Sequence, residues 1–172
     1  MNIRAARDSD RDAIAAIHTA SWQQTYRDVL PDELLDGRLS GIMADRWRTQ
    51  AISDHDVVLV ADADGQLAGF SSTWVEQSTA YIDNLHVRAE YQSRGFGRAM
   101  LRETARQLIG SDISSAYLHV VASNERARLL YLKLGGEPGL IEDKNLYGTI
   151  VPNQVIAWSD LSILAGVTNE PV

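Results

Sequence analysis

No cysteine occurs among the 172 residues of this chain. The absence of thiols excludes a disulfide framework, a zinc–thiolate site and a thiolate nucleophile. If the protein transfers a chemical group, a direct transfer is therefore favoured over one through a cysteine-linked intermediate.

Long apolar runs are also missing. The N-terminus, Met1-Asn2-Ile3-Arg4, has no apolar signal segment, and no run approaches the length of a membrane span. We therefore expect a cytoplasmic protein with no membrane partner. A chain of this length suffices for one domain with a real core, so residues 1–172 are interpreted as a single domain.

Positive charge is scarce as well. The chain has 16 Lys and Arg residues against 23 Asp and Glu residues, which gives a formal net charge of -7. This balance argues against a general nucleic-acid binder, because such proteins present basic surfaces to phosphates. It agrees better with a small or basic binding partner.

The most informative segment is Gln92-Ser93-Arg94-Gly95-Phe96-Gly97. It connects a strand-like run, Ala80 to Val87, to a helix-like run, Phe96 to Ile109. Such a junction directs backbone N–H groups and the positive end of a helix at one point, which suits a diphosphate. The glycines let the backbone approach the anion closely, while Gln92 and Arg94 add donors at the rim.

Two common phosphate-binding motifs do not fit this loop. It is not a Walker A loop, because no Lys-Ser/Thr follows the glycines, and Met100 stands where a dinucleotide fingerprint has its third glycine. A glycine-rich turn between a strand and a helix, with no ligand, is the alternative interpretation.

The loop resembles the acetyl-CoA-binding signature of the GNAT superfamily of N-acetyltransferases, Gln/Arg-x-x-Gly-x-Gly/Ala. The segment Asn124 to Gly135 resembles the second motif of that superfamily, Asn-x-x-Ala-x-x-x-Tyr-x-x-x-Gly. Gly136 departs from the pattern, because a Phe usually follows the last Gly. The resemblance covers roughly residues 56 to 136.

The resemblance implies an α/β (α+β) fold. We expect a GNAT-like mixed, mostly antiparallel sheet of about six to seven strands, flanked by helices and splayed between strands 4 and 5. It also implies an acetyl-CoA-dependent N-acetyltransferase that acts on a primary amine by direct attack in a ternary complex. Acetyl-CoA is the cosubstrate, and no metal is expected.

The resemblance assigns coenzyme contacts to three segments. The diphosphate is expected at the loop, with Arg98 one turn further along the helix. The pantetheine arm is expected to pair with the backbone of the fourth strand, and Asn124 to help hold it, although Asn124 also reads as a helix N-cap. The expected coenzyme-binding residues are Leu85, His86, Val87, Gln92, Arg94, Gly95, Phe96, Gly97, Arg98, Asn124 and Tyr131.

Three residues are candidates for proton transfer. Tyr131 is the candidate general acid for the departing sulfur, because a phenol with a pKa of about 10 holds its proton at neutral pH. It also lies on an apolar helical stripe, so a core role stays open. Asp83 and His119 are the candidate bases, each with a purely structural alternative. Glu76 is a weaker candidate, while His18 reads as a core-edge histidine.

Trp22 and Tyr26 are expected to line the acceptor side, where the variable wall of the family lies. The acceptor is a small-molecule or peptide amine that the sequence does not name. A homodimer is compatible with the family, in which dimers are common. Two other interpretations stay open, namely a catalytically silent acyl-CoA sensor or scaffold and a nucleotide-binding module that uses the glycine-rich turn alone.

Periodicity and turn signals predict the remaining elements. A helix follows Ser9 or Asp10, one of which caps it, and a helix from Pro31 breaks at Gly41. The tail after Leu164 is expected to fray. The predicted strands are Ile3–Ala6, a hairpin of Val57–Ala61 and Leu67–Val75 around Asp64-Gly65, Ala80–Val87, Ala116–Val121, one near Leu140–Lys144 or Leu146–Ile150, and Gln154–Trp158.

Overall fold

The computed structural model describes residues 1–167, which form two compact units. The first unit contains Met1–Asp54, Val58–Ser71 and Asn84–Met100, and the second contains His55–Val57, Ser72–Asp83 and the residues from Leu101 onward. Three strands, β2, β3 and β4, and the helix α3 therefore contribute residues to both units. Among the described residues, none of the helices combines the length and the apolar character needed to cross a membrane.

The strands form a seven-stranded mixed sheet with the order β1-β2-β3-β4-β5-β7-β6. β4 pairs with β5 in parallel, whereas β1–β2, β5–β7 and β6–β7 are antiparallel pairs, which confirms the expected fold class. Their bounds are β1 Asn2–Ala5, β2 Val57–Ala63, β3 Gln66–Glu76, β4 Thr79–Val87, β5 Ser115–Val121, β6 Glu137–Leu146 and β7 Thr149–Trp158.

The parallel pairing of β4 and β5 is short. It joins Thr79 to Ser115, Ala80 to Ala116 and Tyr81 to Tyr117. Both strands run on past this pairing, β4 to Val87 and β5 to Val121. The register agrees with the expected splay between strands 4 and 5.

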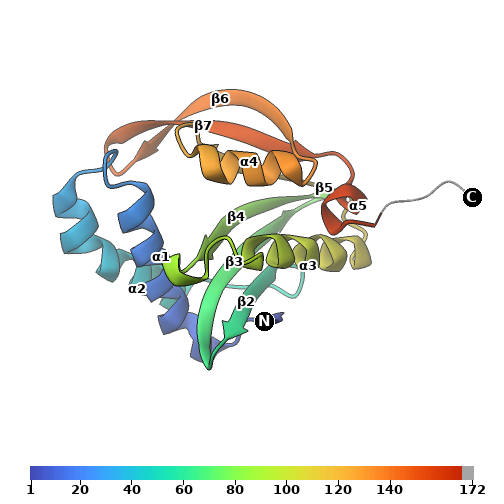
Figure 1. The fold of residues 1–172 in the computed structure, drawn as a ribbon, viewed down its shortest axis with the longest axis horizontal. Coiled ribbons are helices and arrows are strands. Elements are labelled where there is room, and N and C mark those ends of the chain that lie inside the picture. Colours follow the sequence, from blue (N-terminus) through green and yellow to red (C-terminus); the bar gives the residue numbers. More distant parts are fainter. Residues whose placement is uncertain (168–172) are drawn as a thin grey trace, which may run out of the picture. The chain divides into compact units, whose positions relative to one another are not determined.

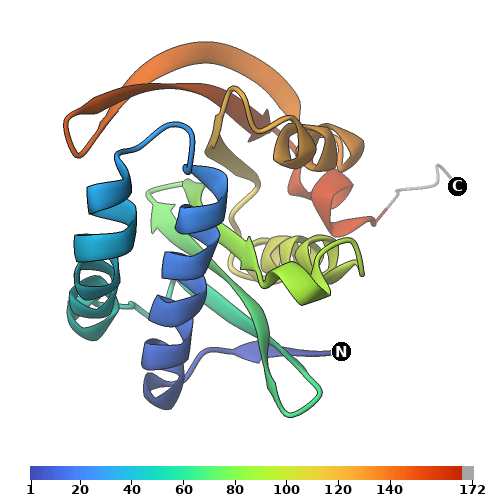
Figure 2. The ribbon, with the colours of Figure 1, turned by 60° about the vertical axis from the view of Figure 1, so that its left-hand side comes forward.

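Two helices of the first unit, α1 (Arg11–Thr25) and α2 (Leu39–Thr49), lie side by side (Figures 1 and 2). A π-helical segment, Glu33–Arg38, leads directly into α2. The predicted break at Gly41 is wrong, because α2 continues through this exposed glycine. Glycine costs a helix about 1 kcal/mol relative to alanine, and the burial of Leu39, Met43 and Trp47 on the inner face outweighs that cost.

The start of α1 also differs from the predicted cap. A short 3₁₀ turn, Asp8–Asp10, precedes the helix, and Asp10 occupies the N-cap position without a side-chain capping bond. Its carboxylate instead accepts hydrogen bonds from the Arg4 guanidinium at 2.7 and 3.0 Å and from the backbone N–H of Arg7 at 2.7 Å. The hydrogen bonds from the Arg4 guanidinium hold the pKa of Asp10 below its usual value, and the Arg4 charge adds to this effect.

The predicted hairpin between β2 and β3 is confirmed, and its turn is the expected pair Asp64-Gly65. Both residues have positive φ, 52° and 79°. Two central residues with positive φ are the requirement of a type I′ turn, whose twist matches the flanking strands.

The second unit contains most of α3 (Phe96–Gly110), together with α4 (Glu125–Lys133), α5 (Leu161–Ala165) and the long β6–β7 hairpin (Figure 1). Of the two alternatives for the sixth strand, Leu140–Lys144 lies inside β6, whereas Leu146–Ile150 spans the hairpin turn. The expected fraying after Leu164 is wrong for Ala165, which is helical and buried. The rest of that tail, from residue 168 on, lies outside the described residues.

Gly136, which replaces the usual Phe, lies against the side chain of Trp158. A Cβ at position 136 would lie 2.5 Å from Ile156 Cγ2 and 2.9 Å from Trp158 Cζ2. The Trp158 indole, which is 2% exposed, donates a hydrogen bond to the Leu134 carbonyl at 3.0 Å. An aromatic ring from β7 therefore occupies the space that a side chain at position 136 would need.

Candidate active site

The loop Gln92–Gly97 has two residues in the left-handed backbone region. Ser93 has φ 63° and Gly95 has φ 86°. Alternation of right- and left-handed residues turns successive N–H groups toward one concave point, which is the geometry of an anion-binding nest. Glycine reaches this region freely, whereas Ser93 adopts it at a cost of order 1–3 kcal/mol.

Side chains hold this loop to the end of β4. The Gln92 amide donates to the Val87 carbonyl at 3.1 Å and to Gln24 Oε1 at 3.4 Å. The Arg94 guanidinium lies 5.4 Å from the ring centroid of Tyr91, a cation–π distance. Gln92, predicted as a donor at the rim, therefore also latches the loop to the strand.

The N-terminus of α3 follows the loop directly. The Gly95 carbonyl accepts from the Ala99 N–H at 3.0 Å, as the first bond of the helix. The N–H groups of the first helical turn consequently have no partner within the helix, and they carry its partial positive charge. The side chains of Arg94 and Arg98 are exposed. These donors and charges fit the diphosphate of a coenzyme.

The side chains of the last residues of β4 have two different environments. Leu85 and Val87 pack against a buried cluster of Ala61, Ala68, Tyr91, Phe96 and Met100. His86 lies near α1, where its Nδ1 is 2.7 Å from Ser21 Oγ, and its Nε2 is 3.3 Å from Asn84 Oδ1. Because Asn84 Oδ1 can only accept, Nε2 carries the imidazole proton and Nδ1 accepts from the Ser21 hydroxyl.

A second histidine lies beneath His86. His18 is fully buried, and its ring centroid is 4.7 Å from that of His86. Its Nδ1 accepts from the Trp47 indole at 3.0 Å. Burial lowers the pKa of His18 to about 2 and that of His86 to about 4, with a further contribution from the Arg46 charge. Both imidazoles are therefore neutral at physiological pH, and His18 belongs to the core.

The two predicted acceptor residues lie together on this side of the first unit. The rings of Trp22 and Tyr26 have centroids 4.6 Å apart, and Trp22 meets the His18 ring edge-on at 5.8 Å. Both side chains are half-buried, and burial raises the pKa of Tyr26 to about 12. The two rings form one aromatic surface, which contacts the histidine pair through Trp22 and His18.

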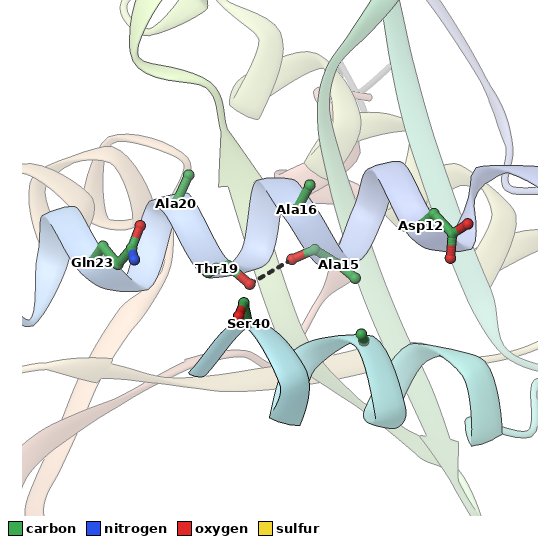
Figure 3. A pocket seen from close by; sticks show the side chains of 8 residues that line it. Asp12, Ala15, Ala16, Thr19, Ala20, Gln23 and Ser40 are labelled. Atoms are coloured by element: carbon green, nitrogen blue, oxygen red, sulfur yellow. Dashed lines mark hydrogen bonds between the residues drawn. The ribbon is translucent and has the colours of Figure 1, made fainter. Parts of the chain in front are cut away.

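A surface pocket lies elsewhere on α1 and α2 (Figure 3). Asp12 is the one ionisable residue in its lining, which otherwise consists of small or neutral residues, namely Ala15, Ala16, Thr19, Ala20, Gln23, Ser40 and Ala44. The Thr19 hydroxyl donates to the Ala15 carbonyl at 2.9 Å. None of the predicted site residues lines this pocket.

In the second unit, α4 carries the other predicted coenzyme contacts. Asn124 caps the helix, because its Oδ1 accepts from the Ala127 N–H at 3.2 Å. The Tyr131 ring packs edge-on against Trp158, with centroids 6.3 Å apart, and Tyr131 is 8% exposed. The capping interpretation of Asn124 is confirmed, and the Tyr131 ring is part of the core.

The two candidate bases lie in the same unit and influence each other. The Asp83 carboxylate accepts from the Trp74 indole at 2.9 Å. Burial lowers the pKa of His119, Lys144 lowers it further, and the charges of Glu142 and Asp83 oppose the shift. A neutral imidazole at physiological pH can accept a proton. His119 Nδ1 is buried and has no hydrogen-bond partner among the described residues.

Two tyrosines beside these bases are absent from the predicted site. Tyr81 and Tyr117 stack with ring centroids 5.1 Å apart, and His119 meets them edge-on at 5.8 and 5.9 Å. The Tyr117 hydroxyl donates to Glu76 Oε2 at 3.0 Å. The sequence could have indicated both tyrosines. Tyr81 lies two residues before Asp83, and Tyr117 two residues before His119, so on each strand the tyrosine shares a face with the candidate base.

Residues 12–136 match the family described as the acetyltransferase (GNAT) family. The chain belongs to this family. The match spans the loop, the strands β4 and β5 and the Tyr131 helix, which are the features built up above. Acetyl-CoA-dependent N-acetyltransfer is the activity of GNAT enzymes and hence of this chain.

Known GNAT proteins resemble the chain over different lengths. The N-acetyltransferase YuaI of Bacillus subtilis (strain 168) is 25% identical over 174 residues, which cover 98% of this chain and 99% of that protein. The ribosomal protein bS18-alanine N-acetyltransferase of Escherichia coli (strain K12) is 35% identical over 85 residues, 49% of this chain and 57% of that enzyme. The likeness to the second therefore spans only about half of each chain.

A solved GNAT structure shares the fold. YncA of Salmonella typhimurium, determined with acetyl-CoA, superposes with a TM-score of 0.67 at 20% identity and covers 94% of each chain. The GNAT interpretation of the two sequence motifs is thus confirmed at the level of family and fold.

Proposed function

We propose that this GNAT enzyme transfers the acetyl group of acetyl-CoA to a primary amine by direct attack in a ternary complex. The observation that carries the proposal is the loop Gln92–Gly97, whose left-handed residues Ser93 and Gly95 form a concave array of N–H groups at the start of α3. Acetyl-CoA supplies the thioester, and the chain supplies the binding, orientation and proton transfer.

The diphosphate is placed against the N–H groups of residues 94–97, with the exposed side chains of Arg94 and Arg98 beside it. The backbone of Leu85, His86 and Val87 offers amide groups to an extended arm, as an edge strand does. Asn124 and Tyr131 are proposed as the contacts from α4.

Two protons must move in the reaction. As the new C–N bond forms and the thioester C–S bond breaks, the nitrogen loses a proton and the sulfur gains one. We assign the first proton to Asp83 or His119, directly or through water, and the second to the Tyr131 hydroxyl. Trp22 and Tyr26 form the proposed wall of the acceptor side.

The relatives do not settle the acceptor, because the bS18-alanine enzymes match only about half of this chain. We propose a small-molecule or peptide amine in the cytoplasm, with neither nucleic acid nor membrane as a partner. Thiol release measured over a panel of amines and peptides tests this proposal. A silent acyl-CoA sensor would instead bind acetyl-CoA in calorimetry and release no thiol with any amine.

Gly97→Val is expected to weaken acetyl-CoA binding at least about tenfold, which corresponds to about 1.4 kcal/mol. The new side chain would stand where the diphosphate meets the first turn of α3. Isothermal titration calorimetry measures the change. Gly95 is less suitable for this test, because its φ of 86° strains any side chain regardless of the ligand.

Gly41→Val is the matched control. Gly41 is helical like Gly97 but more exposed, and a Cβ there meets nothing within 4 Å. We expect this variant to keep wild-type affinity. A folded Gly97→Val protein with unchanged affinity would show that the diphosphate binds elsewhere.

Variants of the two candidate bases are expected to separate their roles through the pH profile of kcat/KM. If His119 accepts the proton, the acidic limb of the profile disappears in His119→Ala. That limb should lie below the usual histidine pKa of about 6.5, because burial lowers the pKa of His119. If Asp83 is the base, Asp83→Asn lowers the rate and the acidic limb survives in His119→Ala. Full activity in the double variant would rule out both residues.

A further inference from the structure

The open face of β3, β4 and β5 in the second unit carries a cluster that the proposed function leaves largely unused. We call it the aromatic–carboxylate patch, and it consists of Trp74, Glu76, Tyr81, Asp83, Tyr117 and His119. These residues alternate with buried neighbours on β4 and β5, namely Ala80, Ile82, Ala116 and Leu118. The patch therefore lies on the side of these strands away from the core.

The patch is half-open to solvent. Glu76 is exposed, and the other members are half-buried. Aromatic side chains on a sheet face normally gain most by full burial. Here two stacked phenol rings and an imidazole edge stay accessible, and Glu76 reaches the hydroxyl of one of the phenols.

Each of the two carboxylates accepts a hydrogen bond from an aromatic side chain of the patch. Glu76 accepts from the Tyr117 hydroxyl at 3.0 Å, and Asp83 accepts from the Trp74 indole at 2.9 Å. Both donors are neutral, and burial together with the Glu76 charge raises the pKa of Tyr117, which keeps its phenol protonated. These two bonds orient the carboxylates and bring no positive charge to them.

The strand geometry sets the scale of the patch. Tyr81 pairs with Tyr117 across β4 and β5, and Glu76 reaches the hydroxyl of that pair. Asp83 and His119 lie two residues further along their strands, roughly 7 Å at 3.3 Å per residue. The two negative charges thus flank a short aromatic surface, and a cation over a tyrosine face gains cation–π attraction.

We propose that the acceptor is a dication, an alkyl amine whose second ammonium group binds Glu76 and the faces of Tyr81 and Tyr117. Its reacting amine then lies toward Asp83 and His119. This inference rests on the proposed function, because it names the substrate class of the same amine site.

The test compares two acceptors of equal length, 1,6-diaminohexane and hexylamine, which differ by one ammonium group. The measured quantity is the ratio of their kcat/KM values in thiol release with acetyl-CoA. In the wild-type enzyme we expect the diamine to be favoured about tenfold, the scale of one cation–π contact with a charged partner. Glu76→Gln should bring this ratio close to one.

Two further variants separate the contributions. Tyr117→Phe keeps the ring but removes the hydroxyl that orients Glu76, so the ratio should fall to an intermediate value. Glu103→Gln, on α3 of the same unit, removes a carboxylate outside the patch and should leave the ratio unchanged.

Equal turnover of both amines by the wild-type enzyme, or an unchanged ratio in Glu76→Gln, would overturn the dication inference and leave acetyl transfer standing. Transfer to an alanine-terminated peptide but to neither alkyl amine would do the same. Acetyl-CoA binding without thiol release from any amine or peptide would instead overturn the proposed function itself.

Discussion

Tyr131→Phe is expected to lower kcat by about 10²- to 10⁴-fold, the usual contribution of a positioned general acid. The substitution removes only the hydroxyl and keeps the ring that packs edge-on against Trp158. Because Tyr131 is only 8% exposed, its ring contributes to the core, and a larger truncation would confuse catalysis with folding. Phenylalanine avoids that confusion.

The rate must be measured under conditions where chemistry limits turnover, for example in single-turnover experiments. Tyr147→Phe is the control, since Tyr147 is 51% exposed at the β6–β7 turn and lies outside the proposed site. We expect Tyr147→Phe to keep the wild-type kcat. If Tyr131→Phe also keeps it, Tyr131 is a core residue and the sulfur receives its proton from another donor.

The second large effect concerns acid stability. The free energy of unfolding is expected to fall by about 4 kcal/mol between pH 8 and pH 5, about 2 kcal/mol each for His18 and His86. Both have folded-state pKa values lowered by burial, to about 2 for His18 and about 4 for His86. The unfolded chain takes up protons below about pH 6.5, whereas the folded chain does not.

This difference in proton uptake makes the protein less stable at acidic pH. The neutral folded forms of His18 and His86 contribute stability that is fully present above the unfolded pKa of about 6.5. It is lost as the pH falls through that value toward the folded pKa, which is about 4 for His86 and about 2 for His18. His119, whose pKa burial also lowers, adds to the drop in the same direction, whereas Asp10 titrates in a more acidic window and adds little between pH 8 and pH 5. Urea unfolding at several pH values measures the effect.

His86→Gln should be less stable at pH 8, because it disturbs the Ser21 and Asn84 contacts, but it should lose about half of the pH-dependent drop. His55→Gln, at an exposed loop position, should keep the full drop. A His86→Gln protein with the wild-type pH dependence would mean that His86 titrates alike in the folded and unfolded states.

The sequence anticipated those parts of the molecule that depend on neighbouring residues. The loop Gln92–Gly97 and the turn Asp64-Gly65 combine glycine with polar residues where the backbone needs positive φ. Their conformations are therefore determined by neighbouring residues in the sequence. The Asn124 cap is equally local, because it binds a backbone N–H three residues away. Together with the Tyr131 spacing, these signals indicated the family and its coenzyme.

Predictions failed where distant packing decided the outcome. Gly41 was expected to break a helix, but Leu39, Met43 and Trp47 bury enough apolar surface to carry α2 through it. α5 was missed because its five residues are too few to show a helical period, and it is held by the burial of Leu161 and Leu164.

Charge states and recognition surfaces also required the tertiary structure. His18 and His86 are 68 residues apart in sequence, yet their rings lie 4.7 Å from each other and lose their basicity through shared burial. Tyr81, Tyr117 and Glu76 come from three different strands, and only strand pairing brings them together beside Asp83 and His119. The sequence alone thus determined the family, the conformation of the loop Gln92–Gly97 and the local turns, because their signals lie within a few neighbouring residues. The protonation of the buried histidines and the surface proposed for the amine were decided by contacts between residues far apart in the chain, whose desolvation and pairing no local pattern encodes.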